Sequence, residues 1–304
     1  MQQLKVGMGV PPARRGDVEG LRTALATAAT AGIDHVGIGD HISFHTGAGT
    51  DGLITATALA MLEPSLSIYL AVYLLPLRHP VPVARQLATL AQLAPGRLIF
   101  GVGVGGEDRH EVEICGVDPR TRGRRMDESL ELLRGLLGGR PVTHHGEFFD
   151  LDTALILPAP SPPIPFSVGG RSDAAVRRAA RLGDGWLGIW NSPRRFAEAV
   201  ALIEQEATVA GRGDVRWQHA MQAWCGLGSS KETARERLAP AMEATYGIPF
   251  EKFERYSPYG RPEDLAEFLS PYVEAGCTTF NLIPIAEDFD AAVAGAAEIK
   301  RLLA

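Results

Sequence analysis

Short, uninterrupted apolar runs alternate with longer amphipathic stretches along most of this 304-residue chain. In the first amphipathic stretch, Val18, Leu21, Leu25 and Ala28 recur at helical spacing, and Asp17 precedes them as a capping residue. The apolar runs predict strands at residues 4–10, 35–39, 66–75, 98–104, 165–168, 185–190, 217–226 and 278–285. The amphipathic stretches predict helices at residues 17–31, 53–62, 80–94, 124–138, 172–182, 193–210, 230–244, 262–275 and 289–303.

This alternation predicts an α/β fold, a (β/α)8 TIM barrel formed by residues 1–304 as a single domain. Continuous apolar strands are typical of parallel strands covered on both faces, and an unbroken series of such units favours a closed barrel over an open sheet. An open sheet would show a glycine-rich fingerprint after its first strand, whereas residues 10–13 read Val-Pro-Pro-Ala. Insertions are predicted after strand 4, where residues 140–163 are too proline-rich for a helix, and near residues 247–260.

Composition and charge narrow the classes of partner. Apolar residues make up 45% of the chain, which is enough to bury a sizeable core. The net charge of −6 argues against a surface that binds nucleic acid or an anionic membrane. Neither a membrane-spanning apolar run nor a secretory signal is visible, which predicts a cytoplasmic protein. The cysteines lie far apart, and His144 and His145 fall within an insertion, so no metal site is expected.

Candidate catalytic residues should directly follow the strands, because the active site of such a barrel lies at the carboxyl ends of its strands. Asp40 and His41 follow the second strand, and Trp190 ends the sixth. An imidazole titrates near neutral pH, so His41 is a candidate to give or take a proton. The other interpretation is that Asp40 and His41 form a satisfied structural pair. A serine nucleophile lacks support, because no G-x-S-x-G motif occurs.

The turn after the fifth strand favours a phosphate. Gly169 and Gly170 allow close approach, and Arg171 and Ser172 add a guanidinium and a hydroxyl where a helix begins. The alternative is a tight turn in which Ser172 is only an N-cap.

Residues 120–125 contain the densest basic cluster of the chain. It is either a solvated helix start, paired with Asp127 and Glu128, or an anion site at the mouth of the barrel.

Five stretches together resemble the luciferase-like monooxygenase family, in its branch that uses the deazaflavin coenzyme F420. They follow the family's order and spacing, and the block from Arg78-His79-Pro80 to the glycines after the fourth strand is the most specific part. The matching stretches are residues 38–41, 75–106, 116–137, 146–151 and 168–188.

The resemblance implies a flavin-type ring over the strand ends and a non-prolyl cis peptide on the third strand, which would fall on Ala71 and Val72. It places the cofactor phosphate on Gly169 and Gly170. The cofactor-binding residues expected on this basis are Asp40, Ala71, Val72, Gly105, Gly106, Arg109, Gly169, Gly170, Arg171 and Ser172. Some deazaflavin dehydrogenases carry a carboxylate where this chain has Gly106, and lysines for a sugar phosphate cannot be placed, which argues against that substrate class.

We therefore expect an oxidoreductase, acting as a homodimer, that transfers a hydride between F420 and a small organic substrate. Asp40 would position the ring edge, His41 would handle the proton, and Trp190 would form a wall on the substrate side. One alternative is an FMN-dependent monooxygenase that uses molecular oxygen. Another is a paralogue that binds a flavin or deazaflavin without turnover.

The acidic tail of F420 also predicts cations at the mouth of the barrel. If several arginines converge there, they would form a positive rim that favours F420 over FMN, with an advantage that shrinks as salt rises. The candidates for this rim are Arg78, Arg109, Arg120, Arg122, Arg124, Arg125 and Arg171.

Overall fold

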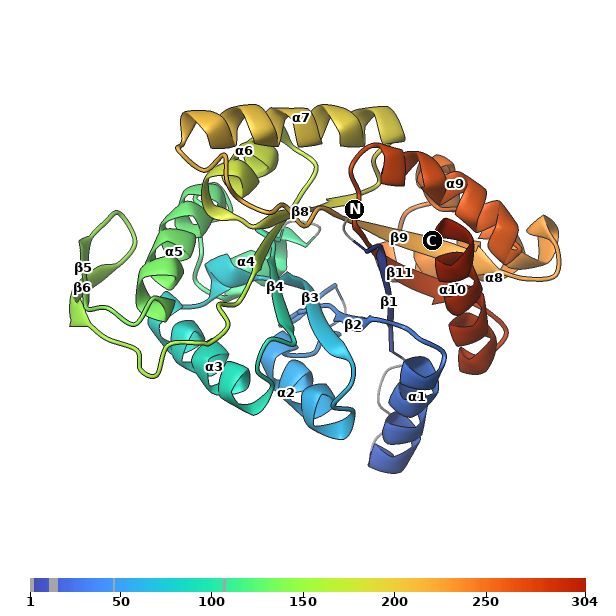
Figure 1. Ribbon diagram of the computed structural model, residues 1–304, viewed down its shortest axis with the longest axis horizontal. Helices are drawn as coiled ribbons and strands as arrows, with labels where there is room; N and C mark the ends of the chain where they lie inside the picture. Colours follow the sequence, from blue (N-terminus) through green and yellow to red (C-terminus); the bar gives the residue numbers. More distant parts are fainter. Residues whose placement is uncertain (1–2, 11–15, 46, 106–107) are drawn as a thin grey trace.

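The predicted barrel is confirmed. The computed structural model describes residues 3–10, 16–45, 47–105 and 108–304. Eight parallel strands form a ring that closes where β8 pairs with β9 and β11 pairs with β1 (Figure 1). In ring order these strands are β1 (Lys5–Gly9), β2 (His35–Ile38), β3 (Ser67–Tyr73), β4 (Leu98–Val102), β7 (Phe166–Gly169), β8 (Gly185–Ile189), β9 (Ala220–Leu227) and β11 (Thr279–Ile285).

Helices surround the strands, as in other barrels of this type. Their starts are capped as the sequence suggests: for example, Ser192 and Ser230 accept hydrogen bonds from backbone amides of the first turns that follow them. The outer helices are α1 (Val18–Thr30), α2 (Gly52–Leu62), α3 (Pro80–Leu93), α5 (Arg122–Leu137), α6 (Asp173–Leu182), α7 (Pro193–Val209), α8 (Lys231–Tyr246), α9 (Pro262–Glu274) and α10 (Phe289–Leu303). None of the helices in the described ranges combines the length and the apolar character that a membrane span needs.

Both predicted insertions are present. The first contains an antiparallel hairpin of β5 (Val142–His145) and β6 (Asp150–Ala154), which projects beside α5 at the edge of the barrel in Figure 1. The second consists of two single turns, η2 (Phe250–Lys252) and η3 (Glu254–Tyr256), followed by the two-residue strand β10 (Tyr259–Gly260).

The sequence patterns missed one helix, α4 (Arg109–Ile114), in the loop between β4 and α5. Its six residues are too few to show an apolar periodicity. Asp108 caps it by accepting hydrogen bonds from the amides of His110 and Glu111. This short helix carries a buried carboxylate, that of Glu111.

Polar side chains are enclosed in the barrel. The Tyr69 hydroxyl donates to Ser167 Oγ at 2.6 Å, and His35 shares a short hydrogen bond with Asn281. His219 is 3% exposed, and neither of its ring nitrogens has a hydrogen-bond partner among the described residues. Burial lowers the pKa of His35 and of His219 to about 4, so both rings are neutral in the folded protein at pH 7.

Stability is therefore expected to fall on acidification. The unfolded chain binds protons on these histidines below about pH 6.5, whereas the folded chain does so only near pH 4. Each histidine should cost up to roughly 3 kcal/mol of unfolding free energy as pH drops through this window. Urea unfolding of wild type and His219→Leu between neutral pH and pH about 4.5 measures the effect, which should be weaker in the variant.

The matched control is His145→Ala, because the His145 side chain is 73% exposed. Identical pH dependence in wild type and His219→Leu would show that His219 does not contribute to it.

Candidate active site

A cavity of about 270 Å³ opens at the carboxyl ends of the barrel strands. Residues at or just after the ends of β2, β3, β4, β7 and β8 line it, together with Gln222 within β9 and the last turn of α8. Arg109, Arg171 and Ser172 do not belong to this lining, and Gly106 lies outside the described residues. The predicted site residues that do line the cavity are Asp40, His41, Ala71, Val72, Gly105, Gly169, Gly170 and Trp190.

One wall of the cavity is formed by the end of β3. The peptide between Ala71 and Val72 is cis, as the resemblance implied, and the pairing register with β4 shifts at this point. Two glycines, Gly103 directly after β4 and Gly169 at the end of β7, accommodate the Val72 side chain. A Cβ at Gly103 would overlap Val72 Cγ2, and a Cβ at Gly169 would lie 2.8 Å from Val72 Cγ1. Residues larger than glycine at these positions would displace Val72.

Gly103→Ala is thus expected to destabilise the protein and to deform the cavity. The valine cannot easily rotate away, because its β-branched side chain is stiff, and overpacking of this kind typically costs about 1–3 kcal/mol. Thermal unfolding together with the affinity for a flavin-type ligand measures both effects. Gly9→Ala is the control, because a Cβ at Gly9 meets no atom within 4 Å. Equal stability and affinity in the two variants would contradict this account of Val72.

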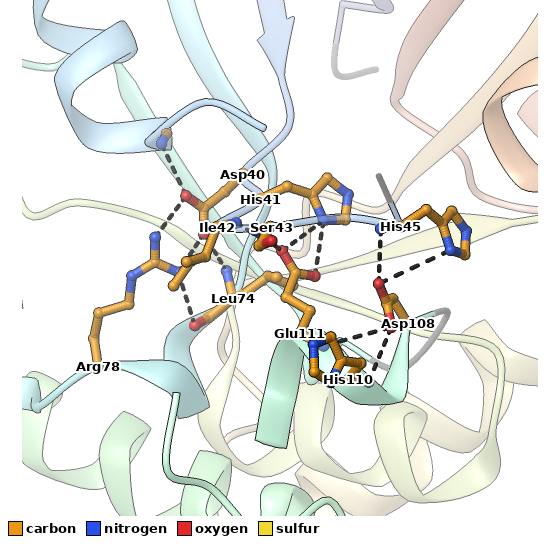
Figure 2. Close-up of polar contacts among 11 residues, drawn as sticks. Asp40, His41, Ile42, Ser43, His45, Leu74, Arg78, Asp108, His110 and Glu111 are labelled. Carbon is orange, nitrogen blue, oxygen red and sulfur yellow. Dashed lines mark hydrogen bonds and ion pairs between the residues drawn. The ribbon is translucent and has the colours of Figure 1, made fainter. Parts of the chain in front are cut away.

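Asp40 is 1% exposed, and its carboxylate binds the chain itself. It accepts hydrogen bonds from the amides of Gly52 and Leu74, both at 2.9 Å, and forms a bidentate ion pair with Arg78 at 2.5 and 2.8 Å (Figure 2). Burial works against the charge of Arg78, but the Asp40 carboxylate outweighs it and raises the pKa of the guanidinium. Asp40 therefore joins the start of α2 to the segment after β3, beside the cavity.

His41 pairs with a residue that the sequence patterns missed. Its Nδ1 lies 3.0 Å from Glu111 Oε2 and 3.3 Å from Oε1, so Asp40 and His41 do not form a pair with each other. Glu111 is 2% exposed, and its Oε1 also accepts the amides of Ile42 at 2.6 Å and Ser43 at 3.0 Å. A signal for Glu111 does exist in the sequence, because an acid three residues after Asp108 matches a capping box at a helix start.

The turn after β7 contains the N-cap that its sequence suggested, and phosphate binding there stays a prediction. Ser172 is the N-cap of α6 and accepts the amide of Ala175 at 3.3 Å. Gly169 and Gly170 nevertheless line the cavity, and Gly170 has a φ of +134° that favours glycine. The Arg171 guanidinium lies 5.4 Å from the centre of the Trp190 ring. A cavity edge with two glycines, a helix start and an arginine offers donors to an anion.

Aromatic side chains form the wall opposite. Trp190 has a φ of +50° and is 9% exposed, and its ring packs against Tyr246 at 5.1 Å and Phe253 at 4.7 Å between ring centres. Phe253 comes from the insertion near residues 247–260, which therefore supports the wall from behind. Neutral polar side chains, Gln222 and Thr245, also line the cavity.

Most of the arginines named for the positive rim bind nearby carboxylates or a carbonyl, which leaves less of their charge for an anionic tail. Arg78 is buried against Asp40, and Arg125 donates to the carbonyl of Pro76. The other pairs are Arg109 with Glu113, Arg120 with Asp118 and Arg124 with Glu147.

The two acids expected to pair with the basic cluster, Asp127 and Glu128, form their ion pairs with residues outside it. Asp127 pairs with Arg178 and Arg181, and Glu128 binds His144. In the described part of the chain, Arg122 and Arg171 have no carboxylate at ion-pair distance, and no three His, Cys, Asp or Glu side chains gather as metal ligands would.

Comparisons with known proteins show which proteins this chain resembles in sequence and in fold. An uncharacterized protein of Mycobacterium tuberculosis (strain H37Rv) is 38% identical over 159 residues, which cover 52% of this chain and 54% of the relative, so the match spans about half of either protein. The F420-dependent glucose-6-phosphate dehydrogenase of Beutenbergia cavernae is 29% identical over 299 residues, with 83% of each chain covered. An F420-dependent secondary alcohol dehydrogenase, solved in complex with an F420-acetone adduct, superposes with a TM-score of 0.86 at 21% identity over 99% of both chains, which shows the shared fold.

The match to a family model covers most of the chain. The profile described as luciferase-like monooxygenase matches residues 5–278, from β1 to the residue before β11, and therefore includes every segment that lines the cavity. The chain belongs to the luciferase-like monooxygenase family.

Proposed function

We propose that this protein is an oxidoreductase that transfers a hydride between coenzyme F420 and a small, uncharged organic substrate. The observation that carries the proposal is the cavity at the strand ends, with glycines beside Val72 on one side and an aromatic wall on the other. Relatives named as F420-dependent dehydrogenases support the choice of cofactor.

The cavity suits a flat, largely apolar ring with a phosphate-bearing chain. Val72 and Leu187 offer apolar contact to the ring, and Gly169 and Gly170 allow the backbone to approach a phosphate closely. Arg171 would pair with that phosphate at the start of α6, and the Ser172 hydroxyl, which accepts the Ala175 amide as the N-cap, can still donate its own hydrogen to it. When bound, the deazaflavin supplies the hydride chemistry, and the protein contributes binding and orientation.

His41 is the residue proposed to move the proton. Its side chain is 34% exposed and lines the cavity, whereas its partner Glu111 is enclosed. Asp40 accepts two hydrogen bonds from Arg78. Its proposed role is to fix the loop that carries His41, and not to exchange a proton with the substrate. Trp190 would bound the substrate on its far side and keep water out.

The lining favours an uncharged substrate. Among the described residues that line the cavity there is no lysine or arginine, so a substrate phosphate or carboxylate would lack a cationic partner there. Gln222 and Thr245 can exchange hydrogen bonds with a hydroxyl or a carbonyl. A neutral alcohol and its ketone or aldehyde fit this chemistry better than a sugar phosphate.

An FMN-dependent monooxygenase is the second candidate, and one observation favours it. Because Arg109, Arg120 and Arg124 are held by local carboxylates, few arginines are left for the acidic tail of F420. Because Arg171 is proposed to bind the phosphate that both cofactors carry, the preference for F420 over FMN would then rest on Arg122 and backbone donors, and should be modest.

A titration of the apo-protein with F420 and with FMN, followed by quenching of tryptophan fluorescence, tests the proposal. F420 is expected to bind more tightly, by a margin that shrinks with salt. Arg171→Ala should weaken F420 binding by about 1.5–3 kcal/mol, the range for a hydrogen bond to a charged group. Arg194→Ala is the control, because that side chain is 88% exposed and pairs with Glu198. Tighter binding of FMN at low salt would favour the monooxygenase.

A further inference from the structure

Two backbone amides and one imidazole nitrogen surround the carboxylate of Glu111. His41 Nδ1 and the amides of Ile42 and Ser43 all point at its oxygens, at distances of 2.6–3.3 Å (Figure 2). With 2% of Glu111 exposed, water has little access to satisfy the carboxylate in place of these groups. An ionised carboxylate can only accept hydrogen bonds, so the imidazole nitrogen beside it must carry a hydrogen.

The position of that hydrogen determines what the other ring nitrogen can do. A neutral imidazole with its hydrogen on Nδ1 has a lone pair on Nε2, and Nε2 is then an acceptor. His41 lines the cavity while its Nδ1 is held by Glu111, so Nε2 is the nitrogen left to meet a ligand.

We propose that Glu111 is a positioning residue that fixes the Nδ1–H tautomer of His41 and thereby makes Nε2 the proton acceptor for a substrate hydroxyl. This inference rests on the proposed function. As the substrate O–H bond breaks, its proton passes to Nε2, and the hydrogen on the carbinol carbon leaves with its electron pair to oxidised F420 while the C=O bond forms. In the reverse direction the imidazolium returns the proton to the carbonyl oxygen.

Among the residues that the structure describes, no second group stands in the same relation to His41. Asp40 directs its carboxylate to Arg78, and Asp108 accepts the amide of His45 at 2.7 Å. Phe44 packs against the His41 ring with 4.2 Å between centres, which fixes its plane without affecting its hydrogens. Of the carboxylates in the described part of the chain, Glu111 is the one within hydrogen-bond distance of the His41 ring.

The Glu111→Gln variant separates two roles of Glu111, namely positioning the His41 ring and anchoring the loop through the amides of Ile42 and Ser43. The amide oxygen can still accept the backbone amides of Ile42 and Ser43, but the amide nitrogen is a donor and would face Nδ1. The variant should therefore keep the loop while reversing the tautomer to Nε2–H. Glu113→Gln is the matched control on the same helix, because Glu113 is half exposed and pairs with Arg109.

Nitrogen NMR of the apo-protein labelled with 15N-histidine, above the pH where histidines are charged, measures the tautomer directly. The His41 signals are assigned by their loss in His41→Asn. The expected result is Nδ1–H in wild type and in Glu113→Gln, and Nε2–H in Glu111→Gln. An Nε2–H tautomer in wild type overturns the proposal even if no variant folds, and so does an unchanged tautomer in a folded Glu111→Gln.

Kinetics then test the consequence for the reaction. Glu111→Gln should lower kcat by about 10²–10⁴-fold, the range for loss of proton transfer, with F420 affinity within about twofold of wild type. Normal kcat in a variant whose tautomer has reversed overturns the proposal. If wild type shows the expected tautomer but exchanges no hydride with F420, the proposed function fails, and the positioning of His41 by Glu111 stands.

Discussion

Replacing His41 with alanine is expected to lower turnover by roughly 10²–10⁴-fold, while the affinity for the cofactor changes little. The imidazole lines the cavity and is oriented by Glu111, so its loss removes the group that moves the proton without removing the glycines and apolar side chains that would hold a ring. Steady-state kcat and a binding titration on the same variant separate the two effects.

His45→Ala provides a control from the same loop. The His45 side chain is 42% exposed and lies 3.9 Å from Asp108, so its loss should leave turnover near that of wild type. Near-normal turnover of His41→Ala would instead assign His41 to packing against Phe44.

The largest expected loss of stability follows from Arg78→Met. This change removes the partner of a carboxylate that is 1% exposed and leaves the Asp40 charge buried. Breaking a buried pair in this way typically costs about 3–5 kcal/mol of unfolding free energy. Urea unfolding at neutral pH measures the cost.

Two further variants make this test specific. Adding Asp40→Asn to Arg78→Met should recover part of the loss, because the neutral amide oxygen can still accept the amides of Gly52 and Leu74. Arg109→Met breaks an exposed pair and should cost only about 0.2–1 kcal/mol. A loss from Arg78→Met as small as that from Arg109→Met would mean that Asp40 and Arg78 contribute no more than an exposed pair.

The barrel was predictable from sequence because its signals are local. Apolar runs such as 98–104 and capped helix starts such as Ser230 mark each unit, and the structure moves the boundaries by only a few residues. The cis peptide at Val72 came from the resemblance alone, since nothing in the local sequence requires it. The aromatic support of Trp190 by Phe253 depends on how a long insertion folds back, which patterns of residues do not encode.

The pairing of charges was not predictable, because it depends on contacts distant in sequence. Asp40 meets Arg78 across 38 positions, and Arg124 finds Glu147 in the hairpin instead of an acid in its own helix. Glu111 was missed because α4 is too short to show a periodicity, although its capping pattern was present. A cavity lies at the strand ends, where the sequence predicted the site, while the charged partners of the candidate residues required the three-dimensional structure.

Transfer of a labelled hydride tests the proposed function most directly. Apo-protein is loaded, without oxygen, with reduced F420 that carries deuterium at the hydride-donating carbon, and is mixed with a panel of small uncharged ketones and aldehydes. The account predicts that oxidised F420 forms together with an alcohol deuterated at the carbinol carbon, detected by mass spectrometry. Retention of the label on F420 throughout the panel, together with oxygen consumption and substrate oxygenation by the protein loaded with reduced FMN, would contradict it.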